Sequence, residues 1–124
     1  MSAMTGLTIL VAAPDQARFR AALTLALTHA ALGGRARVYV HETAVPLLGR
    51  LPRADDTSDR LAANGLPDRL DLIAIALEAD IAIIACQTGM AIAELSIDDL
   101  VDGVEAGGLM AMMTTLGDDR LATF

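Results

Sequence analysis

Residues 81–89, with the sequence IAIIACQTG, decide the fold, because an unbroken apolar run leads directly into the only cysteine of the chain, Cys86. Such a run is typical of a central strand in a parallel sheet, since that strand is buried on both faces. A helix-like segment, residues 90–95, follows. The sequence therefore predicts that Cys86 lies on a strand-to-helix turn, at the edge where open α/β sheets bind ligands.

The rest of the chain alternates between strand-like and helix-like segments. Further strands are expected at residues 7–12, 35–40, 103–108 and 121–124, and helices at residues 15–32, 42–48, 68–79, 97–101 and 109–116. This order predicts an α/β fold, a three-layer α/β/α sandwich with a mainly parallel five-stranded sheet. A length of 124 residues is enough for one core, so residues 1–124 are expected to form a single domain.

Two segments depart from this regular pattern. Residues 35–40 alternate between polar and apolar types, which predicts a strand with one more exposed face. Residues 49–67 contain two prolines and scattered charges with little periodicity, apart from a possible helical turn at 58–63. A loop of this length in a compact domain is expected to be functional or mobile.

The composition excludes several classes of function. The net charge is −7, and all nine basic residues are arginine. An acidic surface argues against nucleic acid and anionic membranes as partners, and the absence of lysine excludes Schiff-base and P-loop chemistry. With only His29 and His41, a histidine-built metal site is not expected. The turn at 12–15 lacks the glycines that would cradle a phosphate, so no cofactor is expected.

A single cysteine excludes an intramolecular disulfide, which indicates a reducing compartment and a cytoplasmic protein. Residues 1–6 show no signal-peptide pattern, and the longest apolar stretch, 21–32, is too short to span a bilayer. The mean hydropathy of +0.50 is high for a small domain. Contacts between subunits are the natural place for the excess apolar surface, so a homo-oligomer is expected.

Cys86 is the candidate catalytic residue. The helix start after it favours a thiolate, and Gln87, Thr88 and Gly89 follow as candidate binding residues. The backbone N–H groups of Thr88 and Gly89 can donate to an anionic sulfur, although both are also ordinary helix-opening residues. The alternative is that Cys86 is a small buried hydrophobic residue, because cysteine is among the most buried residue types. His41 follows the second strand on the same edge, where it either assists proton transfer or is merely a polar residue at a strand end.

Other candidate residues lie further along the chain. Gly107 and Gly108 allow a tight turn into the last helix, and their amides can also face the ligand edge. Arg50 and Arg53 open the long loop and are the cations expected to reach the site, although solvated surface charge is their ordinary role. The methionine-rich segment 110–113 is expected in the core or in a subunit interface.

One combination of segments resembles a known family. The sequence DDLVDGVEAGG at 98–108 after a strand-borne cysteine, the Gly-Leu-Pro at 65–67 and the short terminal strand together resemble the DsrE/DsrF-like sulfur-relay family, in its peroxiredoxin-like bacterial branch. The resemblance implies an α/β/α fold, a homotrimer or hexamer, and sulfur carried as a persulfide. It also implies exchange of that sulfur with TusA-like or rhodanese-like proteins, and it assigns the sulfur-bearing position to Cys86.

The chain departs from the family pattern just after this cysteine. Where many relatives have a second cysteine or a Ser-Met-Asp type of run, it has Gly89, Met90 and Ala91. Without a resolving thiol, internal disulfide chemistry is excluded, which leaves a one-thiol carrier. The sequence therefore supports two hypotheses. One is a small sulfurtransferase-like carrier, and the other is a non-catalytic oligomeric subunit for binding or regulation, in which Cys86 is incidental.

Overall fold

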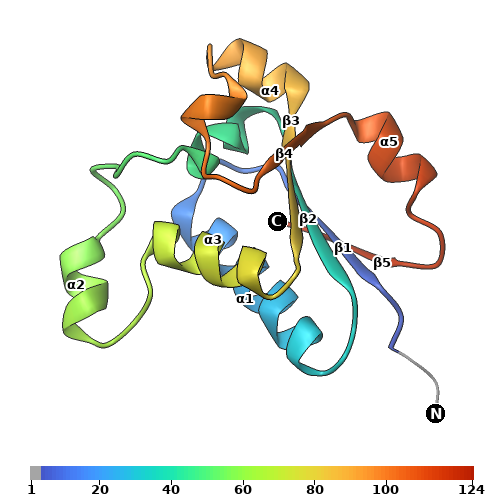
Figure 1. Cartoon of the computed structure of the whole chain (residues 1–124), viewed down its shortest axis with the longest axis horizontal. Coiled ribbons are helices and arrows are strands. Elements are labelled where there is room, and N and C mark those ends of the chain that lie inside the picture. The colour runs from blue at the N-terminus through green and yellow to red at the C-terminus, as the bar shows by residue number, and fades with distance from the viewer. Residues whose placement is uncertain (1–3) are drawn as a thin grey trace.

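The computed structural model describes residues 4–124 as a five-stranded sheet with helices on both faces (Figure 1). The strands are β1 (Leu7–Val11), β2 (Ala36–Val40), β3 (Ala82–Cys86), β4 (Glu105–Gly107) and β5 (Arg120–Thr123). Their order is β4-β3-β2-β1-β5, and every neighbouring pair is parallel. The α/β/α prediction is confirmed, and among the described residues the sheet is parallel throughout.

Helices of unequal size cover the two faces. They are α1 (Gln16–Ala31), α2 (Ser58–Ala63), α3 (Arg69–Glu78), α4 (Gln87–Ile92) and α5 (Leu109–Thr114), with 3-10 helices η1 (Glu42–Leu48) and η2 (Ile97–Asp99). α1 and α3 pack side by side on one face, whereas α5 lies on the other (Figure 1). The chain steps from β1 through β2 and β3 to β4 and then returns to place β5 beside β1. Because crossovers are right-handed, this reversal puts α5 on the opposite face.

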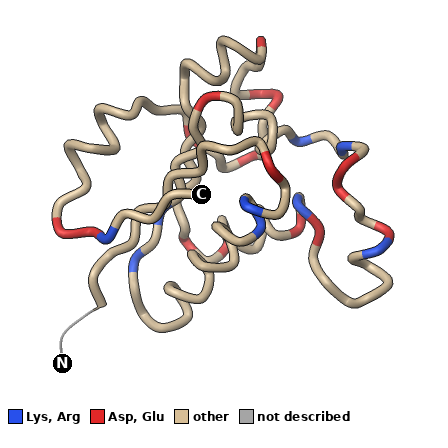
Figure 2. Tube along the Cα trace, turned by 180° about the vertical axis from the view of Figure 1, so that it is seen from behind, with Lys and Arg blue, Asp and Glu red and all other residues tan. Residues whose placement is uncertain are grey.

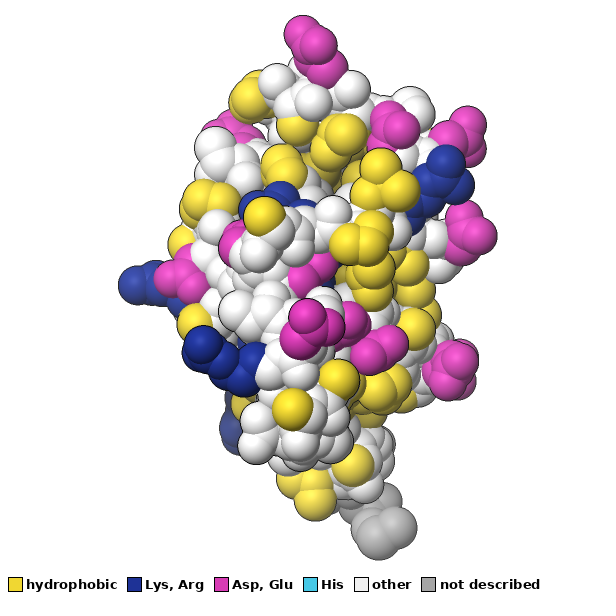
Figure 3. Space-filling model, turned by 90° about the vertical axis from the view of Figure 1, so that its left-hand side faces the viewer, with side chains coloured by type: hydrophobic (Ala, Val, Ile, Leu, Met, Phe, Trp, Pro, Cys, Tyr) yellow, Lys and Arg dark blue, Asp and Glu magenta, His cyan; other side chains and the backbone are white. Residues whose placement is uncertain are grey.

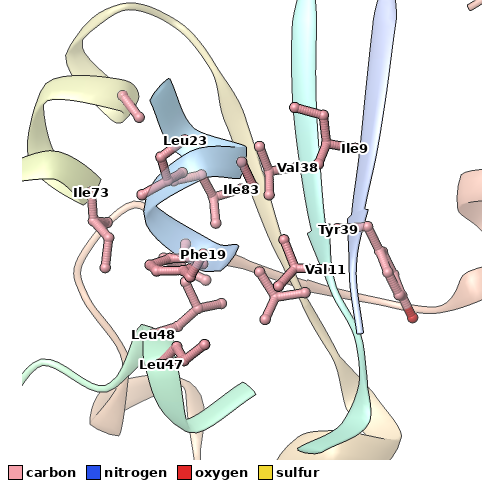
Figure 4. Close-up of a cluster of buried hydrophobic side chains, with 14 of the residues drawn as sticks. Ile9, Val11, Phe19, Leu23, Val38, Tyr39, Leu47, Leu48, Ile73 and Ile83 are labelled. Carbon is pink, nitrogen blue, oxygen red and sulfur yellow. The ribbon is translucent and has the colours of Figure 1, made fainter. Parts of the chain in front are cut away.

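The apolar core fills the space between the sheet and the helices α1 and α3. Ile9, Val38 and Ile83 point from three neighbouring strands toward Phe19 and other apolar side chains of the helices, and all four are buried (Figure 4). Side chains alternate across a strand, so the residue after Val38 must point the other way. That residue is Tyr39, whose ring extends on the far side of the strands in the same view.

Two details differ from the sequence-based expectation. Residues 35–40 were expected to have a more exposed face, but Tyr39 is only 1% exposed because the chain around α5 covers it. The helix expected at 90–95 instead begins at Gln87, directly after Cys86, and ends at Ile92. The expected helix at 97–101 is a single 3-10 turn. The helical turn at 58–63 is confirmed as α2.

A buried ion pair organises the long loop between η1 and α3. Arg69 donates from Nε to Asp56 Oδ1 at 2.7 Å, and both side chains are almost fully buried. The same guanidinium donates to the carbonyl oxygens of Leu47, Gly49 and Leu51 at 2.7 to 2.8 Å. Both basic and acidic residues lie along this loop (Figure 2). The first part of the loop is therefore fixed to the start of α3.

Candidate functional site

Cys86 lies at the carboxyl edge of the sheet, at the end of β3, with a strand on either side. On one side it pairs with Gly107 of β4. On the other side, Val40 of β2 pairs with Ala85, so His41 and Cys86 both follow directly at the same edge. Only 4% of the Cys86 surface is exposed. The thiol is therefore central, and it is enclosed by the elements that meet at this edge.

Donor groups from three elements surround the Cys86 sulfur, and among the described residues none of them forms a regular hydrogen bond with it. The Tyr39 hydroxyl approaches from β2, the backbone N–H of Glu42 from η1, and the backbone N–H groups of Thr88 and Gly89 from α4. Burial by itself raises the pKa of the Cys86 thiol, because it disfavours the charged form. The donors outweigh this effect and hold the pKa of Cys86 below its ordinary value. The site therefore favours a thiolate, which is the nucleophilic form of cysteine.

Tyr39 is the side-chain donor of this group. Its hydroxyl is buried and makes no ordinary hydrogen bond to another described residue, and the group that it faces is Cys86. Burial, followed by the interaction with Cys86, raises the pKa of Tyr39, so the phenol keeps its proton. A neutral thiol is a weak acceptor, and leaving a buried donor without a partner costs about 1–3 kcal/mol. Ionisation of Cys86 supplies the acceptor that this hydroxyl lacks.

Gly89 allows η1 and α4 to pack closely around the thiol. A Cβ at this position would overlap the Glu42 carbonyl oxygen, and it would lie 2.5 Å from Cγ2 of Val45. Glu42 itself has a φ of +39°, in the left-handed region that side chains disfavour. Strained residues of this kind cluster at functional sites. Here the strain belongs to the residue whose N–H points at Cys86.

The structure places the other predicted site residues around this centre. The His41 ring lies 6.1 Å from the Tyr39 ring, and its Nε2 lies 3.9 Å from Glu42 Oε1. Its Nδ1 is buried and has no hydrogen-bond partner among residues 4–124. Gln87 is exposed at the start of α4. His41 therefore lies next to the thiol's hydroxyl donor, and Gln87 faces outward.

A cavity of about 220 Å³ lies between α5 and the sheet, against Tyr39. Its walls come from β2, β3, β4 and α5, and they are formed by Arg37, Tyr39, Ile84, Glu105, Ala106, Gly107, Gly108, Ala111, Met112 and Thr115. Arg37 also fastens α5 to the sheet. Its Nη1 donates to the Thr115 hydroxyl at 2.7 Å, and its Nη2 donates to the Met112 carbonyl at 2.9 Å. Gly107 and Gly108 therefore lie where the thiol edge meets this cavity.

Sequence reasoning missed Tyr39 and Arg37 and proposed other cations. Arg53 pairs with Asp55 at 2.9 Å, and Arg50 and Arg53 line a separate cavity beside Leu95. The feature of the sequence that could have identified Tyr39 and Arg37 was the alternation of polar and apolar residues at 35–40. It places Arg37, Tyr39 and the following His41 on one side of the strand.

Among residues 4–124, no group of three or more His, Cys, Asp or Glu side chains is arranged to hold a metal ion. Within the same range, no helix has both the length and the apolar character needed to cross a bilayer.

Comparison with known proteins identifies the fold. The crystal structure of the ychN protein from E. coli matches with a TM-score of 0.74 at 20% identity, covering 98% of this chain and 100% of that one. MTH1491 from Methanobacterium thermoautotrophicum, a protein of unknown function, matches with a TM-score of 0.71 at 14% identity, with the same coverage. No protein-family profile and no curated sequence matches the chain. The likeness shows that this chain shares the fold of these two proteins.

Proposed function

We propose that this protein is a small sulfur carrier that holds sulfane sulfur as a persulfide on Cys86. The observation that carries the proposal is the set of donors around the sulfur, the Tyr39 hydroxyl and the N–H groups of Glu42, Thr88 and Gly89. These donors favour an anion, which suits both the attacking thiolate and a charged persulfide. A residue that served only to fill the core would need no such donors.

The lack of a second thiol gives the carrier a defined behaviour. Cys86 is the only cysteine, so a persulfide on it cannot be attacked by another cysteine of the same chain. The adduct should therefore persist until an external thiol accepts the sulfur. On the family resemblance, we expect TusA-like or rhodanese-like proteins to be the exchange partners and the cytoplasm to be the location.

A homotrimer or hexamer is part of the same proposal. Met110 of α5 is 81% exposed, and Met113 is 50% exposed. Residues 106–117 around them contain no charged residue. Figure 3 shows that hydrophobic side chains also reach the surface on another side, between acidic ones. Assembly of several copies would bury part of this surface.

The alternative is a binding or regulatory subunit in which Cys86 is incidental. The observation in its favour is that the residue is only 4% exposed, which limits contact with any donor or acceptor. The two functions differ in one measurable property. A carrier gains sulfur on Cys86, whereas a binding subunit does not.

The test is intact-mass spectrometry after exposure to inorganic polysulfide. Wild-type protein should gain the mass of one or more sulfur atoms, and dithiothreitol should remove it. Cys86→Ser should gain none, because serine has a similar size without the nucleophilic sulfur. Native protein that takes up no sulfur, under conditions that load a small control thiol, would favour the binding subunit.

A further inference from the structure

We propose that the cavity between α5 and the sheet is the binding pocket for a short inorganic sulfur chain, which reaches the Cys86 sulfur from the α5 side. This inference rests on the proposed carrier function and specifies its substrate class. It makes a small polysulfide, and not a persulfide with a bulky organic group, the direct source of the sulfur.

The strand geometry places the thiol on the same face as the cavity. Ile84 lines the cavity, and Cys86 follows it two residues later along β3, so both side chains point to the same face. Gly107 also lines the cavity, and it is the residue that pairs with Cys86 across the ladder. Cys86 itself is not part of the cavity lining, but Ile84 and Gly107 are, so the cavity ends next to the sulfur-bearing residue.

Tyr39 connects the cavity to the thiol and supplies evidence independent of the cysteine. Its ring lines the cavity, and its hydroxyl faces Cys86. The side chain is 1% exposed, and the hydroxyl lacks an ordinary hydrogen-bond partner among the described residues. Buried polar groups of this kind are normally paired. A sulfur anion bound in the cavity would offer this hydroxyl an acceptor in place of the Cys86 thiolate.

The size of the cavity selects the class of substrate. Its volume of about 220 Å³ lies below the range of about 300–1,000 Å³ typical of pockets for drug-sized ligands. A chain of a few sulfur atoms fits this space, whereas most of a peptide-borne persulfide such as that of glutathione would have to stay outside it.

Two charged residues, Arg37 and Glu105, line the cavity. The Arg37 side chain is only 14% exposed, and the nearest oxygen of Asp119 lies 3.9 Å from it. That carboxylate makes its closer contact, 2.5 Å, with Arg35. Glu105 is the other charged residue of the lining, and it is exposed. The Asp119 side chain is itself only 3% exposed, so the buried cation has a buried carboxylate beside it, and the exposed charge of the lining is that of Glu105.

The transfer step needs no additional reactant. The Cys86 thiolate attacks the terminal sulfur of a hydrogen polysulfide, HS–S–S⁻, and a bond forms between Sγ and that sulfur. The bond between the terminal sulfur and its neighbour breaks, and its electron pair leaves with the remaining S₂²⁻. The proton moves to the leaving S₂²⁻, so the products are the persulfide anion Cys–S–S⁻ and HS–S⁻. Two negative charges are present before the step and two after it, and no oxidant is consumed.

The experiment fills the cavity and leaves Cys86 and its donors unchanged. Ala111 is an exposed alanine of α5 that lines the cavity, so Ala111→Phe places a ring in the proposed pocket. Ala21→Phe is the matched control, because Ala21 is an exposed alanine of α1, on the other side of the sheet. The rates of sulfur uptake from inorganic polysulfide and from glutathione persulfide are measured by mass spectrometry. The uptake rate from each sulfur donor is divided by the rate at which the same donor reacts with a small free thiol, which corrects for the reactivity of the donor itself.

We expect wild-type protein and Ala21→Phe to load from inorganic polysulfide at equal rates. Ala111→Phe should load about tenfold more slowly or worse, because misplacing a reactant by about 1 Å is already costly. Wild-type protein should also prefer polysulfide over glutathione persulfide by at least about tenfold. Equal rates for Ala111→Phe and wild type, or no preference between the donors, would overturn the pocket and leave the carrier function standing. Wild type that does not load at all would instead overturn the carrier function.

Gly108→Leu provides a second variant in case Ala111→Phe does not fold. Gly108 lines the cavity, and an added Cβ there would meet no atom within 4 Å. Its φ of −115° is ordinary for any residue. We expect the same slow loading from polysulfide, with an unchanged circular dichroism spectrum. A folded Gly108→Leu protein that loads at the wild-type rate would contradict the proposal.

Discussion

The two faces of the sheet are built for different purposes. On the α1/α3 face, apolar side chains such as Ile9, Val38 and Ile83 are fully buried against the two longest helices. On the α5 face, the same strands carry Thr8, Arg37 and Tyr39 beneath a helix of six residues with one buried side chain, Met112. The first face is packed as a core. The second keeps buried polar groups and a cavity beside Cys86.

The two faces also differ in whether their buried polar groups have hydrogen-bond or ion-pair partners. On the α1/α3 side, the buried Asp56 and Arg69 form an ion pair and are further satisfied by backbone groups. On the α5 side, the Tyr39 hydroxyl has no ordinary partner among the described residues. A paired group stabilises a loop, whereas an unpaired one is available to a ligand or a thiolate. We infer that the α1/α3 face mainly stabilises the fold and that the α5 face carries the reactive groups.

The largest expected effect is on stability, and it differs between the faces. Leu23→Ala opens a cavity in the packed α1/α3 core and should lower the free energy of unfolding by about 3–5 kcal/mol. Met112→Ala removes a side chain that already borders a cavity, so its cost should be about 2 kcal/mol, the lower end for such changes. Urea unfolding followed by circular dichroism measures both. Equal losses would show that the two faces are packed alike.

The next effect concerns the ion pair of the long loop. Asp56→Asn leaves the Arg69 guanidinium buried without its counter-charge and should cost about 3 kcal/mol at neutral pH. Burial raises the pKa of Asp56, but hydrogen bonds from Arg69, the Arg53 N–H and Gln16 outweigh it and lower that pKa below the ordinary value.

Because the pKa of Asp56 is depressed in the folded state, its stabilising effect is present above the unfolded value of about 3.9 and is lost as the pH falls through the folded value. Urea titrations at several pH values should show that the difference in the free energy of unfolding between wild type and Asp56→Asn becomes smaller in acid. A gap that stays constant as the pH falls would contradict the role assigned to the pair.

A smaller effect is expected from the hydroxyl of the α5 face. Tyr39→Phe removes one donor to the Cys86 thiolate and should raise the pKa of Cys86. Since a hydrogen bond to a charged group contributes at least about 1.5 kcal/mol, alkylation by iodoacetamide below both pKa values should slow about tenfold. The rates should converge at high pH, where both proteins are fully ionised. Thr114→Val, which removes an exposed hydroxyl from α5, serves as the control and should leave the rate unchanged.

The same contrast explains what the sequence could predict. The apolar run 81–85 and the helical periodicity of α1 and α3 report burial directly, so the layers and the position of Cys86 followed from them. The α5 face gives a weaker signal, because a short helix covers polar residues that look exposed in the alternating segment 35–40. The convergence of Tyr39 and the Glu42 amide on Cys86 depends on β2 and β3 being neighbours, which local pattern does not reveal.

The central claim is that the α5 face holds Cys86 as a thiolate in spite of its burial. The direct measurement is the ultraviolet absorbance of the thiolate as a function of pH, for the folded protein and for the same protein unfolded in urea, with Cys86→Ser as the blank. The folded protein should titrate at a lower pH than the unfolded chain, since hydrogen bonds to the charged form outweigh desolvation. A folded midpoint equal to or above the unfolded one would show that burial dominates, and it would contradict the account.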